Sequence, residues 1–480
     1  MNWKKAVSVL LVSAMALSIT ACGNGGNTTT SNADGAGKNE AAENGAAAGT
    51  ESEGGTDGAA ATGEKLVVWT LSNDLIDFGE RYQEQTGVTV ETVVIEPANY
   101  PTKVQTALLA GEKEPDIIVG EPKMLEDFYD AGFFEDLDQY GAQDYADQIV
   151  DYVWEVGQSE DGVQRAISYQ ITPAGIYYRR DIAKEVFGTD DPEEVGKLFA
   201  DYPTILETAD KLKNAGYRIF SSDAEMNVFS GDSAWVVDGT LNVSEARYEY
   251  MDLCVQLYQD GLTAYANQWS TPWYQAMAGE VPILTADIQN YADDSVDVWD
   301  AEAFEEATKD MMKTEVFAFG LPSWGVLTMR DNVKDTSGLW GVCSGPASGF
   351  DGGTYIGISS QSEKKDLAWD FVKFCTLNEE TADWWIEFSQ GDTVSLKSAL
   401  EKHKDDANEI YGGEKLYQFW LEQAKTIDTS KVTRYDQAIG DAWGNAISAV
   451  KTGEKTKEEA VAEFYDKIES TYPDITVNRE

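Results

Sequence analysis

The order of elements in this chain is set by residues 65–120, which read KLVVWTLSNDLIDFGERYQEQTGVTVETVVIEPANYPTKVQTALLAGEKEPDIIVG. Short apolar runs alternate here with amphipathic runs, and Gly87 and Gly111 stand where the amphipathic runs stop. A glycine just past the last helical residue is typical of a helix end. The pattern predicts strands over 65–70, 88–95 and 115–120 and helices over 74–86 and 100–110. This order predicts an α/β fold with a parallel sheet covered by helices on both faces.

Two polar residues follow strands of this predicted sheet. Asn73 lies in the loop after the first strand, and Glu121 directly follows the third. Open parallel sheets bind ligands at the carboxyl ends of their strands. We therefore predict that Asn73 and Glu121 contact a ligand, with helix capping as the alternative for Asn73.

The residues before this region predict export and anchoring. Residues 1–21 have the basic, apolar and small-residue order of a secretory signal, and the apolar run is too short for a membrane span. Ile19-Thr20-Ala21-Cys22 resembles the bacterial lipobox, which implies a lipoprotein signal peptide and a lipidated Cys22; a chance cysteine after an ordinary signal is the alternative. Residues 23–64 lack Val, Ile, Leu, Phe, Tyr and Trp, so residues 22–64 are expected to form a disordered, lipid-anchored tether.

Charge and histidine content exclude several functions. The chain has 36 Lys and Arg against 85 Asp and Glu, a formal charge of −49, and the acidic residues are spread along it. Because nucleic acid is bound by basic patches, we expect no nucleic-acid partner. The single histidine, His403, lies in a charged run expected to be exposed, which leaves little for a zinc site or a Ser-His-Asp triad. We expect no metal and no cofactor.

The cysteines imply no disulfide framework. Cys254, Cys343 and Cys375 remain besides Cys22, and an odd set cannot pair completely. Cys254 lies in an apolar helical pattern, where cysteine usually behaves as a small buried hydrophobe. Whether Cys343 and Cys375 bond each other is left open.

The later sequence adds further elements. The apolar and amphipathic patterns predict strands over 281–286 and 352–358, helices over 244–259 and 364–377, and mostly helical structure beyond 379.

Several stretches together resemble one family. They are 65–70 as the opening strand, Glu114-Pro115-Asp116-Ile117-Ile118-Val119 with 131–137 downstream, 177–181, 278–283, 352–360 followed by 364–371, and 450–460. In this order they resemble extracellular solute-binding proteins (family 1) of ABC importers, especially the carbohydrate-binding lipoproteins of Gram-positive bacteria. Tyr178-Arg179-Arg180 departs from the commoner Tyr-Asn followed by a basic residue, which affects the expected hinge contacts.

The resemblance implies a two-lobed, periplasmic-binding-protein-like fold with a hinge and an interlobe ligand cleft. The first lobe would comprise residues 65–171 plus about 354–400, and the second about 172–353 plus about 401–480. The implied function is capture of a sugar or oligosaccharide and its unaltered delivery to ABC permease subunits, by a monomer anchored on the extracellular face of the membrane. The chain is then not an enzyme. The alternative is a secreted glycosidase or lyase that uses paired carboxylates.

Sugar recognition needs aromatic planes and polar partners for hydroxyl groups. Four tryptophans lie in stretches rich in Gly, Ser or Pro and are predicted to be loop residues that stack on ligand, with core packing as the alternative: Trp235, Trp269, Trp273 and Trp324. Further ligand-binding candidates are Asp287, after the 281–286 strand, and Gly353 and Tyr355, at the presumed hinge strand. Trp369, Trp384, Trp385 and Trp420 lie in helical patterns and are expected in the core.

Overall fold

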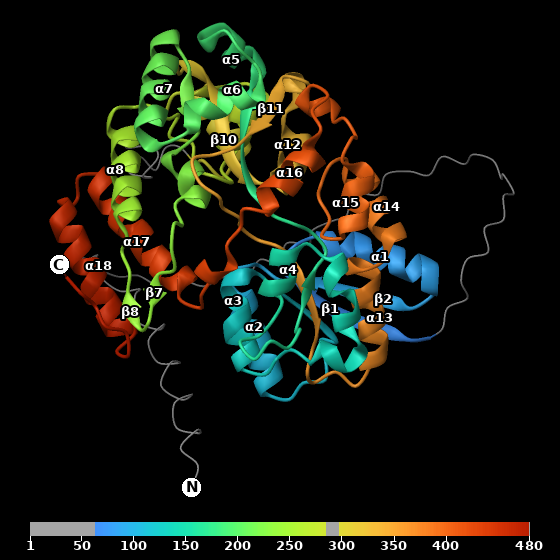
Figure 1. Ribbon diagram of the computed structural model, residues 1–480. Helices are drawn as coiled ribbons and strands as arrows, with labels where there is room; N and C mark the ends of the chain where they lie inside the picture. Colours follow the sequence, from blue (N-terminus) through green and yellow to red (C-terminus); the bar gives the residue numbers. More distant parts are fainter. Residues whose placement is uncertain (1–62, 285–296, 480) are drawn as a thin grey trace, which may run out of the picture. The chain divides into compact units, whose positions relative to one another are not determined.

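A computed structural model describes residues 63–284 and 297–479 of the chain (Figure 1). The first of two five-stranded sheets has the order β2-β1-β3-β12-β4. Its strands are β1 (Lys65–Thr70), β2 (Thr89–Val94), β3 (Ile117–Gly120), β4 (Ile167–Ser168) and β12 (Tyr355–Ile358). β1 pairs in parallel with β2 and β3, as predicted, whereas β12 runs antiparallel to both β3 and β4. The predicted parallel arrangement is therefore confirmed for three strands, and the complete sheet is mixed.

Helices α1 (Asp74–Thr86), α2 (Tyr100–Leu109), α3 (Pro122–Asp130), α13 (Lys365–Thr376) and α14 (Glu379–Ser389) accompany this sheet. The bounds of α1 agree with the prediction because Gly87 adopts a φ of 75° and its N–H bonds to the oxygen of Gln83. The hydroxyl of Tyr100, buried in α2, accepts from the Val119 N–H at 2.9 Å and reaches the Trp69 oxygen at 3.0 Å. One side chain thus ties α2 to both β1 and β3.

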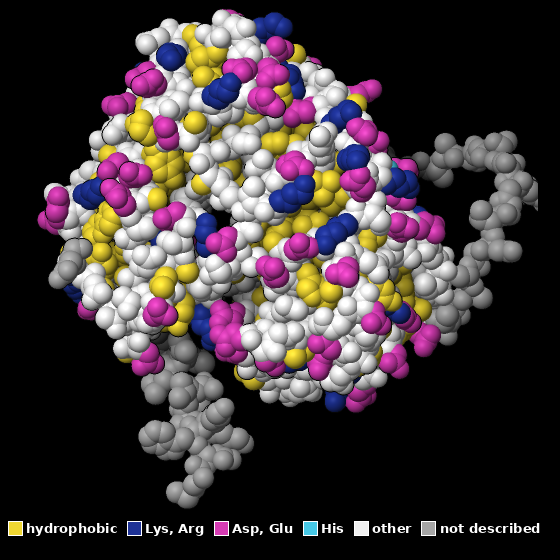
Figure 2. Space-filling view, viewed as in Figure 1, with side chains coloured by type: hydrophobic (Ala, Val, Ile, Leu, Met, Phe, Trp, Pro, Cys, Tyr) yellow, Lys and Arg dark blue, Asp and Glu magenta, His cyan; other side chains and the backbone are white. Residues whose placement is uncertain are grey.

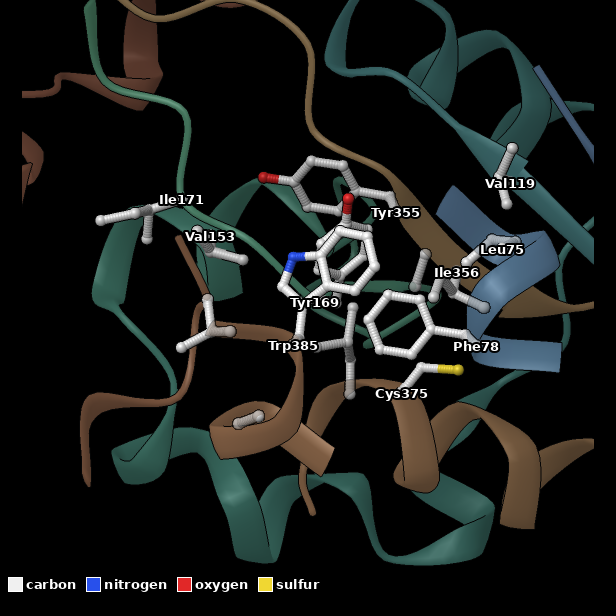
Figure 3. Close-up of a cluster of buried hydrophobic side chains, with 14 of the residues drawn as sticks. Leu75, Phe78, Val119, Val153, Tyr169, Ile171, Tyr355, Ile356, Cys375 and Trp385 are labelled. Carbon is white, nitrogen blue, oxygen red and sulfur yellow. The ribbon is translucent and has the colours of Figure 1, made fainter. Parts of the chain in front are cut away.

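Aromatic side chains fill the space between the first sheet and α14. Phe78 stacks on Trp385 with ring centroids 4.7 Å apart, and Tyr169 meets the Trp385 ring edge-on at 5.4 Å (Figure 3). Trp385 also donates its indole N–H to the buried Asp392 at 2.9 Å. The expected core positions of Trp369, Trp385 and Trp420 are confirmed, and Trp384 is half-buried.

Asp116, at the entrance to β3, is fully buried and joins three segments. Its carboxylate accepts from the backbone N–H of Val67 at 3.0 Å, from the Ser362 hydroxyl at 2.6 Å and from Lys364 Nζ at 2.9 Å. The start of α13 is thereby fixed to the centre of the first sheet.

The second sheet has the order β11-β5-β10-β6, and β9 pairs with β10. Its strands are β5 (Ala174–Arg179), β6 (Arg218–Phe220), β9 (Glu280–Pro282), β10 (Lys313–Pro322) and β11 (Trp340–Cys343). β9 is shorter than the predicted 281–286 strand, whose last two positions lie outside the described residues. Every residue of β5 is buried, and its side chains alternate between two hydrophobic clusters, Tyr177 in one and Ile176 and Tyr178 in the other. Both faces of this sheet are therefore covered.

Different helices form the two covers. The cluster that contains Tyr177 also holds side chains of α9 (Thr271–Ala278), α12 (Gly325–Asn332) and α16 (Leu416–Ala424). The other cluster holds side chains of α7 (Tyr202–Ala215), α8 (Glu245–Gln259), α17 (Asp436–Lys451) and α18 (Lys457–Thr471). None of the helices in the described part of the chain is long and apolar enough to span a bilayer.

Two antiparallel segments connect the sheets. Residues 169–173 lead from β4 to β5, and residues 344–354 lead from β11 to β12. Ala174 N–H donates to the Gly349 oxygen at 2.8 Å, and the Thr172 hydroxyl donates to the Gly352 oxygen at 3.3 Å. The segments lie at the positions predicted for the hinge; the lobe boundaries drawn from the sequence stay a prediction.

Two local expectations have clear outcomes. His403 is 8% exposed, and its ring nitrogens contact the carboxylates of Asp383 and Asp406 at 3.0 and 2.6 Å, so the expectation of an exposed histidine is wrong. Cys343 and Cys375 are free, buried and members of different hydrophobic clusters. Figure 2 shows acidic side chains scattered over the visible face rather than gathered in one patch.

Candidate functional site

A cavity of about 930 Å³ lies against the second sheet and the connecting segments. This volume is at the upper end of the range usual for small-molecule sites. Its lining comes from the start of α3, residues 223–235, α8, residues 268–269, the end of β10 with Trp324, residues 348–352 and residues 427–451. The start of α3 beside the first sheet, the end of β10 in the second sheet and the C-terminal helices therefore meet around one space.

Two tryptophans form an aromatic wall of this cavity. The rings of Trp269 and Trp324 are stacked at 5.9 Å with 21° between their planes. Trp324 is held by a 3.0 Å hydrogen bond from its indole N–H to the backbone oxygen of Asp351. Trp269 is 48% exposed and has a φ of 69°, a left-handed conformation that few residues other than glycine adopt. An exposed aromatic face in a strained backbone is typical of a binding site.

A third tryptophan, Trp235, packs against the middle of α17. The guanidinium of Arg247 lies 3.6 Å from the ring centroid of Trp235, and Trp443 meets that ring edge-on at 6.2 Å. Arg247 is buried and donates to the backbone oxygens of Ser233 and Asn242. Burial lowers the pKa of Arg247 to about 10, which leaves it charged at neutral pH. The indole nitrogen of Trp443 is buried without a hydrogen-bond partner among the described residues.

Polar groups line the remaining walls. Lys123 Nζ lies 3.4 Å from the Asp351 carboxylate, and Lys451 Nζ lies 2.8 Å from both carboxylate oxygens of Asp223. Asp436 accepts from the N–H and the hydroxyl of Thr433, and burial raises its pKa. The cavity therefore offers carboxylate acceptors and ammonium donors beside aromatic rings, the combination that hydroxyl-rich ligands require.

Of the predicted site residues, the structure brings together Trp235, Trp269 and Trp324 as cavity lining. Trp273 does not lie in a loop, because Pro272 stands in the first turn of α9 and Trp273 is fully buried within that helix. Its indole N–H donates to Glu225 at 2.8 Å.

Asn73, Glu121, Gly353 and Tyr355, the other predicted positions that the structure describes, are not part of the cavity lining. Tyr355 is 1% exposed and belongs to the core of the first sheet, as Figure 3 shows. Gly352, not Gly353, lines the cavity, and Pro122 and Lys123 line it where Glu121 was predicted. Burial raises the pKa of Glu121. Asn73 precedes α1, and its side chain makes no capping hydrogen bond. Asp287 and Cys22 lie outside the described residues.

Sequence reasoning missed Arg247, Trp443 and Asp436. Arg247 belongs to α8, and the other two belong to α17. Helical periodicity predicts only whether a residue faces the protein core or solvent. It does not predict that one side of a helix borders a cavity.

A charged contact joins α3 to the segment that leads into α17. Arg434 donates to the Glu126 carboxylate through Nε at 2.9 Å and Nη2 at 2.7 Å, and Nη2 also lies 2.7 Å from Asp130. The backbone N–H of Arg434 donates to the second oxygen of Glu126 at 2.7 Å. Because Lys431, Val432 and Asp436 line the cavity, this contact fastens one of its walls to α3.

Residues 78–412 match the family model described as bacterial extracellular solute-binding protein. The match spans more than half of the chain, and the protein belongs to this family.

Solved structures show the same fold. A protein described as an extracellular solute-binding protein family 1 is 18% identical, with a TM-score of 0.67, and the match covers 85% of this chain and 99% of that one. An ABC transporter associated binding protein from B. animalis subsp. lactis Bl-04, in complex with beta-1,6-galactobiose, is 18% identical, with a TM-score of 0.65 and coverage of 87% and 100%. The GacH receptor of Streptomyces glaucescens GLA.O, solved unliganded and with acarbose, is 16% identical, with a TM-score of 0.63 and coverage of 86% and 99%. The predicted two-lobed, periplasmic-binding-protein-like α/β fold is confirmed.

Proposed function

We propose that this chain is the binding protein of an ABC importer, that it holds a sugar or oligosaccharide in the cavity of about 930 Å³, and that it delivers the sugar unaltered to the permease. The observation that carries the proposal is the gathering of Trp235, Trp269 and Trp324 around one space that also presents carboxylates and ammonium groups. Complexes of similarly folded proteins with beta-1,6-galactobiose and with lacto-N-biose support the ligand class.

The lining residues would divide the work of recognition. A tryptophan face that covers ~50 Å² of a pyranose ring contributes on the order of 1 kcal/mol of apolar transfer energy. Preference for one sugar must then come from groups such as Asp351, Lys123 and Asp436, which hydrogen-bond hydroxyls at fixed positions. A ligand that touches residues from both lobes favours the closed arrangement by its difference in affinity for the two states.

The ligand class is tested by a thermal-shift and calorimetric screen of beta-1,6-galactobiose, lacto-N-biose, maltose and acarbose, with new reducing ends measured in parallel. We expect at least one saturable rise in Tm with the sugar recovered intact. New reducing ends would favour the glycosidase alternative, and no shift with any of the four would contradict the proposal.

Trp324→Ala and Trp269→Ala are each expected to weaken sugar binding about tenfold, or about 1.4 kcal/mol, because each removes a stacking face. Calorimetric titration measures the change. Trp384→Phe is the matched control, since that half-buried tryptophan of α14 lies outside the cavity lining and its replacement should leave affinity unchanged. Equal losses in all three variants would remove the two tryptophans from the site.

We also propose that the protein is a lipoprotein held at the extracellular face of the membrane through Cys22, as a monomer. Each buried methylene of an acyl chain contributes ~0.8 kcal/mol, so the chains added at one cysteine hold a protein stably. Cys22→Ala is expected to move the protein from the membrane fraction to the medium, as measured by fractionation and mass spectrometry of the mature N-terminus. Equal membrane retention of the variant would exclude the anchor.

A further inference from the structure

A buried carboxylate lies behind the tryptophan wall of the cavity. Glu225 belongs to the 3-10 helix Asp223–Phe229, and its side chain is fully buried. One carboxylate oxygen accepts from the Trp273 indole N–H at 2.8 Å and from the Ser221 hydroxyl, and the other accepts from the Gly320 N–H at 3.1 Å. Within the part of the chain that the structure describes, no ion pair involves Glu225.

Such an arrangement is energetically demanding. A carboxylate removed from water without a cation loses much of its solvation, and here burial raises the pKa of Glu225 to about 7. Four donors offset part of this penalty: the Ser221 hydroxyl, the Trp273 indole N–H, the Gly320 N–H and the Gln268 side chain. Because burial of this carboxylate costs stability, we look for the role of Glu225 in the residues that donate hydrogen bonds to it.

Two of these donor residues, Gly320 and Trp273, line the cavity or contact a residue that lines it. Gly320 lines the cavity from β10, and a Cβ added to it would come within 1.9 Å of the Glu225 backbone oxygen, so the two segments are in close contact. Trp273 contacts the exposed Trp269 with ring centroids 5.0 Å apart and 52° between planes. Trp269 has the strained φ of 69°, a conformation that persists only where its surroundings enforce it.

We propose that Glu225 is a positioning residue of the binding site: its carboxylate fixes Trp273 against β10 and thereby sets the Trp269 ring on which the ligand stacks. The part that concerns the ligand rests on the proposed function. The part that concerns the ring does not.

The role requires two acceptor oxygens. Trp273 and Gly320 can only donate, and they face different oxygens of the carboxylate. Glu225→Gln keeps the shape but turns an NH₂ group toward one of these two donors, so one hydrogen bond is lost and two donors meet. In Glu225→Gln combined with Trp273→Phe, the amide oxygen can face Gly320 and the NH₂ group can face the Ser221 hydroxyl, which accepts as well as donates.

Fluorine NMR of protein labelled with 5-fluorotryptophan tests the position of the ring without any ligand. The Trp269 signal, assigned by its absence in Trp269→Phe, is expected to shift or broaden in Glu225→Gln. We expect it to return toward its original position in the double variant with Trp273→Phe. Glu414→Gln is the matched control, since Glu414 bonds Arg180 and the Val342 N–H away from the cavity lining, and it should leave the Trp269 signal unmoved. An unchanged Trp269 signal in Glu225→Gln would overturn the proposal.

Affinity for beta-1,6-galactobiose, or for the tightest binder of the four-sugar screen, tests the ligand part. Glu225→Gln is expected to weaken binding about tenfold in the wild-type background and less than twofold in a Trp269→Ala background. Equal losses in both backgrounds would show that Glu225 does not act through Trp269. If the wild-type protein binds no sugar, the proposed function fails, and the fluorine experiment still decides the role of Glu225.

Discussion

Replacing Asp116 with alanine is expected to lower the free energy of unfolding by about 1–3 kcal/mol, because the buried Val67 N–H loses its acceptor while the partly exposed Lys364 ammonium can turn to water. The carboxylate is fully buried and satisfies the Val67 N–H, the Ser362 hydroxyl and the Lys364 ammonium. Its loss leaves a backbone N–H of β1 without an acceptor and releases the start of α13 from the sheet. Urea unfolding followed by linear extrapolation measures the change.

An exposed acid on the same helix provides the control. Asp370 pairs with Lys373 at 2.8 Å, but the Asp370 side chain is 59% exposed. Because exposed ion pairs contribute little to the free energy of unfolding, Asp370→Ala should change that free energy by no more than about 0.5 kcal/mol. A comparable loss in both variants would mean that the Asp116 contacts do not stabilise the sheet beyond an ordinary surface pair.

Stability is expected to fall by several kcal/mol between about pH 4 and pH 8. Burial raises the pKa of Glu225 from 4.5 to about 7, and burial together with the charge of Asp74 raises the pKa of Asp392 from 3.8 to about 7. In this window the folded protein holds protons that the unfolded chain has released, so the free energy of unfolding decreases as pH rises. At ~1.4 kcal/mol per pKa unit, each group contributes on the order of 3 kcal/mol.

Calorimetric unfolding at pH 5, 6, 7 and 8 measures this slope. Glu225→Gln and Asp392→Asn carry amides that do not titrate, so each variant should flatten the dependence whatever its stability at pH 5. An unaltered slope in both variants would assign the effect to general repulsion in a chain of formal charge −49 rather than to these two carboxylates.

The fold was predictable where local signals agree. Gly87 fixed the end of α1, and the apolar runs around Val67 and Ile118 placed β1 and β3 in a parallel sheet. The antiparallel pairing of β12 depends on contact between residues more than 200 positions apart, for example Ile356 with Val119. No local periodicity encodes such a pairing, and the family resemblance assigned residues 354–400 to the first lobe without giving the direction of this strand.

Part of the candidate site was predictable from local sequence signals as well. Trp235, Trp269 and Trp324 lie beside turn-forming residues, and the structure places all three at the cavity. Trp273 has similar neighbours, but the proline before it begins a helix that carries the ring into the core. The sequence did not identify Glu225, because nothing in the sequence distinguishes a glutamate that is exposed to solvent from one that is buried behind the cavity lining.

The contact at Arg434 bears on how firmly the wall beside α17 is held to α3. Its guanidinium and the Glu126 carboxylate are each 29% exposed, and Asp130 is 58% exposed. Water therefore reaches every partner, although the paired hydrogen bonds to Glu126 and the second acid make this a network of charges rather than a single surface pair. Because every group in this network can exchange its partner for water, we expect the wall beside α17 to detach from α3 without any cofactor or covalent step.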